Sequence, residues 1–253
     1  CRTFRDAFSA VAEGRARLAM IPIENSVAGR VADIHHLLPS SGLFIVGEHF
    51  ERVHHNLLAI SGTQLDDITH VHSHIHALNQ CRKVLEGMNI ESVEHVDTAG
   101  AAAEVASKGH SSQAAIASTL AAESYGLVSL KSNIEDEQHN TTRFVIMSAR
   151  EERPSQDFAP NEVITSFIFR VRNVPAALFK AMGGFATNGI NMTKLESYIS
   201  EGFFAAQFYA DVEGHPDQRS LKLAMEELSF FTHDIRILGV YPADSYRSTY
   251  VRS

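Results

Sequence analysis

The chain has 253 residues, 44% of them hydrophobic, and a formal net charge of −8, which describes an acidic globular protein long enough for two domains. The acidity excludes a nucleic-acid surface as the main function, because such a surface needs a basic stripe. The two cysteines are too few for a disulfide framework and no apolar run is long enough to cross a bilayer, so we expect a cytoplasmic protein without a membrane partner.

Hydrophobic periodicity predicts alternating helices and strands through the first 150 residues. Apolar residues three and four apart predict helices over 3–14, 31–38, 78–88, 98–108 and 119–125. Short apolar runs predict strands over 18–23, 43–50, 53–60 and 114–118, with a further short run at 69–72 and another from 144 onwards. This alternation predicts an α/β domain with a mostly parallel sheet.

Residues 151–161 are polar, contain Pro154 and Pro160 and have no periodicity, so they are the predicted linker. Beyond them the pattern predicts strands over 163–171, 190–199, 203–212 and 235–240, and helices over 176–187 and 217–231. The order strand–helix–strand–strand–helix–strand is that of a ferredoxin-like βαββαβ domain. Residues 243–253 remain as a C-terminal tail.

The segment Asn140–Phe144 ends an acidic polar run and opens a strand-like run. It therefore places the hydroxyls of Thr141 and Thr142 and the guanidinium of Arg143 at a loop-to-strand junction, where a rigid scaffold can aim them at a ligand. These groups suit an anionic substrate that must lose an oxygen. The simpler alternative is the start of a strand with a surface arginine.

Three other segments accompany this one along the chain. They are the run Pro22-Ile23-Glu24-Asn25-Ser26, the pair Ser73-His74 followed by Gln80-Cys81-Arg82, and the run 114–118 followed by 120–127. In this order and at these spacings the set resembles the prephenate dehydratase family, from about Thr3 to Pro242. That family converts prephenate to phenylpyruvate on the route to phenylalanine.

The resemblance implies a catalytic domain over residues 1–150 and an amino-acid-sensing ACT domain over 162–242, in a homodimer or homotetramer. It implies two lobes like those of a periplasmic binding protein, one from 3–49 and 140–148 and the other from 52–132, with sites on facing loops. It also implies that a Gly-rich strand and a helix carrying a serine precede Cys1.

The implied reaction removes carbon dioxide and the ring hydroxyl from prephenate and makes an aromatic ring. Aromatisation drives it, so no metal or redox cofactor is expected. The enzyme must hold the carboxylates and donate a hydrogen bond to the departing hydroxyl. The resemblance assigns that donor role to Thr142.

The resemblance and the chemistry of the side chains give further predicted roles. Glu24 is expected to orient other groups, because a carboxylate repels a dianion. The predicted substrate-binding residues are Asn25, Ser26, Ser73, His74, Gln80, Thr141, Arg143 and Phe144. The roles of two residues stay open. Ser26 either caps the following helix or provides donors at the N-terminus of that helix. Arg143 either binds a substrate carboxylate or anchors the strand to an internal acid. Ile75 and His76 depart from the family, where many members have Pro and Gln.

Alternating histidines at positions 72, 74 and 76 would share one face of a strand, and three imidazoles can bind zinc. No cysteine or carboxylate completes the set, so we predict no metal site. The pairs His35-His36 and His54-His55 are expected to be partly exposed.

The resemblance implies a phenylalanine site on the ACT domain, formed by the turn 175–179 and the second strand. The predicted effector residues are Ala176, Ala177, Leu178, Asn191, Glu196 and Ser197. Two positions depart from the family, which has Gly in place of Ala176 and Arg-Pro after the Glu-Ser pair. The alternative for this half is a role in dimerisation only. For the whole chain the alternatives are an arogenate dehydratase and a non-catalytic sensor of aromatic amino acids.

Overall fold

The structure is a computed structural model, and it describes residues 1, 3–137, 139–172, 174–198 and 207–250. It contains two compact units. Unit 1 comprises Cys1–Glu24, Arg30–Phe50 and Arg143–Ser253, and unit 2 comprises Asn25–Gly29 and Glu51–Thr142. Within the described residues, every helix is too short or too polar to span a bilayer.

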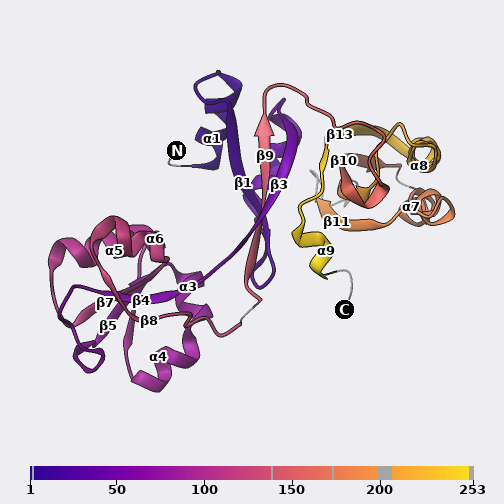
Figure 1. Ribbon diagram of the computed structural model, residues 1–253. Helices are drawn as coiled ribbons and strands as arrows, with labels where there is room; N and C mark the ends of the chain where they lie inside the picture. Colours follow the sequence, from indigo (N-terminus) through magenta and orange to yellow (C-terminus); the bar gives the residue numbers. More distant parts are fainter. Residues whose placement is uncertain (2, 138, 173, 199–206, 251–253) are drawn as a thin grey trace. The chain divides into compact units, whose positions relative to one another are not determined.

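The first sheet of unit 1 has the strand order β2-β1-β9-β3 among the described residues, so the late strand β9 lies between two early ones. Its strands are β1 (Leu18–Asn25), β2 (Gly29–Arg30), β3 (Phe44–Arg52) and β9 (Thr141–Ser148) (Figure 1). The helices that accompany it are α1 (Phe4–Ala12) and α2 (Ala32–Leu37), followed by a 3-10 turn over Leu38–Ser40. The predicted strand at 18–23 is buried on one side only, because Leu18 and Met20 are exposed while Ile21 and Ile23 lie in the core.

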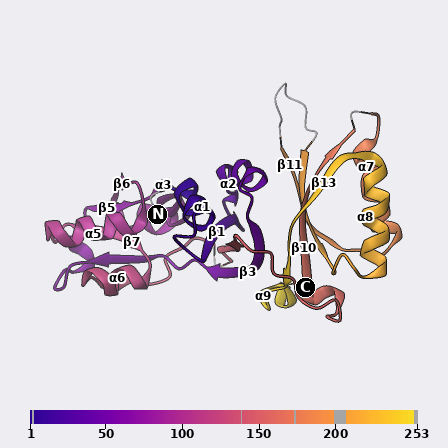
Figure 2. The same cartoon turned by 90° about the horizontal axis from the view of Figure 1, so that it is seen from above.

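The second sheet of unit 1 has the order β11-β12-β10-β13 in the described part of the chain. Its strands are β10 (Val163–Val171), β11 (Met192–Tyr198), β12 (Gln207–Glu213) and β13 (Thr232–Pro242), and each pairs antiparallel with its neighbour. Helices α7 (Ala177–Thr187) and α8 (Arg219–Phe231) lie side by side over one face (Figure 2). The elements follow the predicted order, although residues 199 and 203–206 of the predicted strands lie outside the described residues.

This second sheet is buried on both faces. Phe167 and Phe169 of β10 pack with α7 and α8, whereas Ile164 and Ile168 pack with the first sheet. The burial of β10 therefore does not alternate, since eight of its nine residues are buried. Gly239 of β13 allows the close approach of the two sheets, because a Cβ there would overlap the carbonyl of Ile45.

Unit 2 is built on a sheet of order β6-β5-β7-β4-β8, counted over the described residues. The strands are β4 (Asn56–Ala59), β5 (His70–Ser73), β6 (Glu91–Glu94), β7 (Gln113–Ala117) and β8 (Val128–Lys131). The helices are α3 (Ile75–Gln80), α4 (Arg82–Met88), α5 (Thr98–Lys108) and α6 (Thr119–Tyr125). Leu57 and Ile116 pack with α3 and α4, and Leu58 and Ala115 pack with α5 and α6, so helices cover both faces.

Three expectations for unit 2 are wrong. The sheet is mixed, because β5 pairs parallel with β6 and β7 but β4 pairs antiparallel with β7 and β8. The edge strands β6 and β8 were not predicted, since both are short and mostly exposed. The single helix predicted over 78–88 is two helices that meet at Cys81. The loop residue Asp136 separates them: its N–H donates to the Gln80 carbonyl at 2.6 Å, and its carboxylate accepts from the N–H of Lys83.

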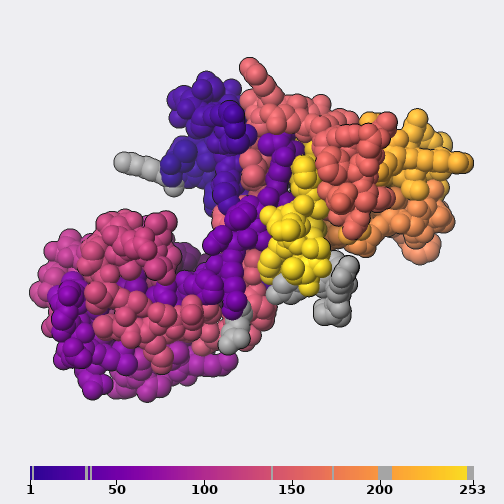
Figure 3. Space-filling model, in the orientation of Figure 1, coloured from indigo at the N-terminus to yellow at the C-terminus, as the bar shows by residue number. Residues whose placement is uncertain are grey.

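The predicted C-terminal tail contains helix α9 (Tyr246–Tyr250), which packs against β3 (Figure 3). The Tyr246 ring stacks on Phe50 with 4.7 Å between centroids, and Arg247 donates two hydrogen bonds to Glu48. The predicted linker 151–161 is mostly exposed and irregular up to a 3-10 turn at Pro160–Glu162. The boundaries of the catalytic, linker and ACT segments stay a prediction.

Candidate active site

The side chain of Asn25, at the end of β1, is held in one orientation. Its Oδ1 accepts hydrogen bonds from the backbone N–H groups of Val27 and Ala28 at 3.0 and 2.8 Å. Its Nδ2 therefore faces the other way, where it donates to Asn140 Oδ1 at 2.7 Å and to Thr142 Oγ1 at 3.0 Å. An amide nitrogen can only donate, so the bonds made by Oδ1 determine which atom meets Thr142.

Thr142 is consequently the acceptor in its bond with Asn25. A hydroxyl that accepts one hydrogen bond keeps its own proton for another acceptor. Thr142 is half-buried at the start of β9. The contact with Asn25 thus leaves the Thr142 proton available for a further acceptor.

Gln80, at the C-terminal end of α3, belongs to the same hydrogen-bond network. Its Oε1 accepts from Asn140 Nδ2 and from His55 Nε2, both at 2.8 Å. The amide NH2 of Gln80 can therefore still donate to a further acceptor. Asn140 links Gln80 to Asn25, so five polar residues form one connected cluster within unit 2, namely Asn25, His55, Gln80, Asn140 and Thr142.

Two members of this cluster were missed from the sequence. Asn140 opens the segment Asn140–Phe144, but it received no role, although a polar residue directly before two threonines was a usable signal. His55 was expected to be partly exposed and is instead 6% exposed. Nothing in its local sequence indicates burial, because Gln80, which it contacts, is 25 residues away.

A hollow of about 320 Å³ in unit 2 is lined in part by Gln80. Lys83 contributes a positive charge to its wall, and Asp136 and Glu137 contribute negative charges. The remaining lining residues are Val27, Ala28, His76 and Asn79. The hollow can therefore meet both carboxylate and ammonium groups of a ligand.

The predicted serines make contacts within the protein. Ser26 Oγ donates to the carbonyl of His139 at 2.7 Å and accepts from the N–H of Thr141 at 2.9 Å. It does not cap α2, whose N-cap is Val31, so a helix N-terminus does not follow Ser26 directly as expected. Ser73 is fully buried and donates to the carbonyl of Ile116 at 2.7 Å, which ties β5 to β7.

Histidines 72, 74 and 76 do not share a strand face, because β5 ends at Ser73. His72 is buried, His74 is the N-cap of α3 and accepts from the N–H of His76, and His76 is an exposed residue of the helix. Among the residues that the structure describes, no three histidine, cysteine or acidic side chains are grouped to hold a metal ion.

Arg143 lies in unit 1, is 2% exposed and binds acids on both sides of its strand. Its Nε donates to Glu48 at 2.8 Å, and its Nη1 donates to Glu24 at 2.9 Å and Asp211 at 2.6 Å. Its Nη2 donates to Tyr241 Oη at 3.0 Å. Burial lowers the pKa of Arg143, but Asp211, Glu48 and two tyrosines raise that pKa by more than burial lowers it. The guanidinium is therefore always charged. Of the two interpretations of Arg143, this geometry favours the internal anchor.

The neighbours of Arg143 and Thr142 in sequence lie as follows. Thr141 is buried and its Oγ1 donates to the carbonyl of His139 at 3.2 Å, and Phe144 is half-buried on β9. Glu24 of β1 accepts from Arg143 and from Lys194 Nζ at 2.5 Å. Burial raises the pKa of Glu24, but Arg143 and Lys194 outweigh burial and hold that pKa below its ordinary value.

The predicted effector residues lie around α7 and β11. Ala176 is the N-cap of α7 and has a left-handed backbone, with φ 60° and ψ 22°. Ala177 is buried, Leu178 is half-buried, and the carbonyl of Asn191 accepts from the N–H of Glu213. On β11, Glu196 accepts from Lys194 at 3.2 Å, and the carbonyl of Ser197 accepts from Arg30 at 3.3 Å.

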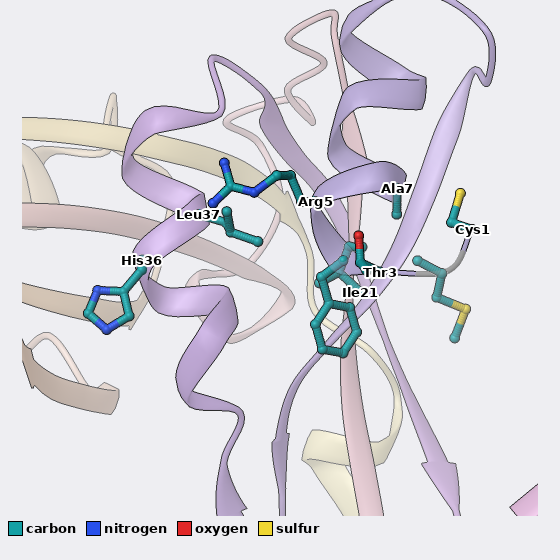
Figure 4. A pocket seen from close by; sticks show the side chains of 9 residues that line it. Cys1, Thr3, Arg5, Ala7, Ile21, His36 and Leu37 are labelled. Carbon is teal, nitrogen blue, oxygen red and sulfur yellow. The ribbon is translucent and has the colours of Figure 1, made fainter. Parts of the chain in front are cut away.

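A second hollow, of about 710 Å³, lies in unit 1 between α1, β1 and α2 (Figure 4). Its lining residues are Cys1, Thr3, Phe4, Arg5, Ala7, Met20, Ile21, His36 and Leu37. None of the predicted site residues lines this hollow, so its size is not evidence that it is the active site.

Comparison with known proteins gives consistent matches. The family model described as prephenate dehydratase matches residues 1–152. The chain is 52% identical over 98% of its length to a bifunctional N-acyl-homoserine lactone acylase/prephenate dehydratase of Komagataeibacter europaeus, of which it covers 88%. It is 37% identical over 98% of its length to arogenate dehydratase/prephenate dehydratase 1, chloroplastic, of Arabidopsis thaliana, of which it covers 66%, just under two thirds.

A solved structure, prephenate dehydratase of Arthrobacter aurescens in complex with L-Phe, matches with a TM-score of 0.85 and 28% identity. The match covers 99% of this chain and 88% of the other. The matched relatives are named as enzymes, which favours an enzyme over a non-catalytic sensor.

Proposed function

Because the chain belongs to the prephenate dehydratase family, a family of lyases, we propose that it performs this reaction at the hydrogen-bonded pair Asn25 and Thr142. The observation that carries the proposal is the bond from Asn25 Nδ2 to Thr142 Oγ1, which leaves the threonine proton for the substrate. Prephenate dianion and one proton give phenylpyruvate anion, carbon dioxide and water. The departing ring hydroxyl gains negative charge as its bond to carbon breaks, and the Thr142 hydroxyl donates to that oxygen.

The test is turnover of prephenate by the purified chain, followed as phenylpyruvate, with Thr142→Ala beside the wild type. Loss of one such donor typically lowers kcat by roughly 10²–10³. Thr142→Ser keeps the hydroxyl and should retain most of the rate. If Thr142→Ala turns over prephenate at nearly the wild-type rate, Thr142 has no part in the mechanism.

The other predicted residues have supporting roles in the proposal. Gln80 offers its amide NH2, and Lys83 its ammonium, to the substrate carboxylates. Asn140 and His55 act indirectly, because they fix the orientation of the side-chain amides of Asn25 and Gln80. Ser26 and Ser73 have a structural part in the proposal, since each donates to a backbone carbonyl of the protein. A role of His74, Thr141 and Phe144 in substrate binding stays a prediction.

Arogenate is a second substrate candidate, which the name of the Arabidopsis relative supports. Arogenate carries an ammonium on its side chain where prephenate has a keto group. Asp136 and Glu137 in the wall of the hollow suit that ammonium, and Lys83 suits the carboxylates. The ratio of kcat/KM for the two substrates decides between them, and Glu137→Gln should lower kcat/KM for arogenate but not for prephenate.

For the second sheet of unit 1 with its two helices we propose an ACT domain over residues 162–242 that binds phenylalanine. The order βαββαβ and the sheet order β11-β12-β10-β13 support it, as does the L-Phe complex of the Arthrobacter relative. The site would use Ala176, Ala177, Leu178, Asn191, Glu196 and Ser197. Calorimetry tests it: no heat with millimolar phenylalanine would leave dimerisation as the role of this half.

We propose for the remainder of the chain a catalytic domain with two lobes like a periplasmic binding protein, which is supported by a separate sheet in each unit. We also propose a homodimer or homotetramer and a cytoplasmic location; the free cysteines Cys1 and Cys81 suit a reducing compartment. Light scattering and cell fractionation test these two points.

A second activity follows from the name of the Komagataeibacter relative, which is 52% identical to this chain. We propose that the chain also hydrolyses N-acyl-homoserine lactones at the amide bond, so that one water gives a fatty acid and homoserine lactone. Mass spectrometry of both products after incubation with the purified chain tests it. Testing Thr142→Ala in parallel shows whether the two activities share a site.

A further inference from the structure

Lys194 of β11 is shared between two carboxylates within unit 1. Its side chain is 9% exposed, and its Nζ lies 2.5 Å from Glu24 Oε2 and 3.2 Å from Glu196 Oε1. A nearly buried ammonium needs such partners, because burial without them is costly. Lys194 therefore connects β1 of the first sheet with β11 of the second.

On the first sheet, the partner of Lys194 is joined directly to the proposed catalytic pair. Glu24 immediately precedes Asn25 in the chain, and Glu24 Oε1 accepts from Arg143, which immediately follows Thr142. Lys194 and Arg143 together hold the Glu24 carboxylate, one on each oxygen. The position of Glu24 thus affects the backbone that aims Asn25 and Thr142.

On the second sheet, the partner of Lys194 belongs to the proposed effector segment. Glu196 also faces Arg30 of β2, whose Nη1 lies 3.8 Å from Glu196 Oε2. An amino-acid effector carries an ammonium, which binds a carboxylate and competes with Lys194 for it. An effector at Glu196 would then change which of the two carboxylates, that of Glu196 or that of Glu24, the Lys194 ammonium binds.

We propose that Lys194 is a positioning residue for the Asn25–Thr142 pair, and that it transmits effector binding at Glu196 to that pair through Glu24. This inference rests on the proposed function for its kinetic test and on the geometry above for its structural test. The effector would be an α-amino acid, and phenylalanine is the probe.

The experiment compares the wild type, Lys194→Met, Lys194→Arg and a matched control, Lys222→Met, which removes an exposed lysine of α8. We expect Lys194→Met to lower kcat by roughly 10- to 100-fold with little change in KM, because small misplacements of catalytic groups cost that much. The phenylalanine concentration for half-inhibition should rise at least tenfold. Lys194→Arg should restore most of both properties, and Lys222→Met should change neither.

Hydrogen exchange followed by mass spectrometry supplies a readout that does not need turnover. The N–H of Ser26 bonds to the Thr141 carbonyl, and that of Thr141 bonds to Ser26 Oγ, so peptides covering 24–28 and 139–145 report on the site. We expect faster exchange there in Lys194→Met only. A wild type without turnover refutes the proposed function but leaves this measurement valid. Unchanged exchange in Lys194→Met, or a folded Lys194→Met with wild-type kcat and inhibition, overturns the inference.

Discussion

Replacement of Arg143 by methionine distinguishes an internal anchor from a substrate ligand. Methionine keeps much of the side-chain volume but leaves Glu24, Glu48 and Asp211 without their shared cation. The side chains of Glu48 and Asp211 are both 0% exposed, so water cannot replace the guanidinium. Removal of one partner from a buried ion pair typically costs about 3–5 kcal/mol.

For a chain of this size, 1 kcal/mol corresponds to about 2–4 °C in Tm, so Arg143→Met should lower Tm by roughly 6–20 °C. The matched control is Arg170→Met in the same unit. Arg170 pairs with Asp234 at the surface, where both side chains are 54% exposed, and such pairs contribute about 0–1 kcal/mol. Thermal unfolding followed by circular dichroism measures both variants.

An Arg143→Met protein with unchanged Tm and a greatly raised KM would refute the anchor and support the substrate-ligand interpretation. Arg143→Lys refines the test. A single ammonium cannot reach three carboxylates and Tyr241 at once, so this variant should recover only part of the lost stability.

Three further outcomes are expected. Burial raises the pKa of Asp211, but Arg143, Ser166 and Tyr209 outweigh burial and hold that pKa below its ordinary value. The folded carboxylate therefore binds protons less readily than the unfolded one, so its contribution to stability is complete above about pH 3.9 and disappears as the pH falls through the folded pKa. Urea unfolding from neutral to acid pH should show this loss of stability. Asp211→Asn, although less stable at neutral pH, should lose less stability as the pH falls. An equal dependence of the unfolding free energy on acid pH in the two proteins would contradict the assignment. Ala176→Gly should raise Tm by about 2–4 °C, because it relieves about 1 kcal/mol of left-handed strain, and no gain would mean that the turn is not strained. Gly239→Ala should cost about 1–3 kcal/mol or more in urea unfolding, because the added Cβ overlaps the Ile45 carbonyl, whereas Gly87→Ala, which meets nothing within 4 Å, should be tolerated.

Much of the fold was readable from local patterns. Phe4, Phe8 and Val11 recur at helical spacing, and Asp97 and Ser118 cap the helices that follow them, so these elements depend on residues close in sequence. The break at Cys81 was not readable, because the hydrogen bonds that Asp136 makes on either side of it come from 55 positions away. The edge strands β6 and β8 lacked an apolar pattern because they have few buried residues.

The candidate site divides in the same way. The sequence by itself determined which polar residues are present and that Asn25 and Thr142 each stand where a polar loop meets a strand. Only the tertiary structure decided that Asn25 donates to Thr142 and to Asn140, that Asn140 connects this pair to Gln80 and His55, and that Arg143 binds buried acids. The reason is physical: a hydrogen bond or ion pair depends on distance in space, and these partners are 25 to 117 residues apart in the chain. Periodicity reports only which face of an element is apolar, so it cannot reveal which polar groups meet.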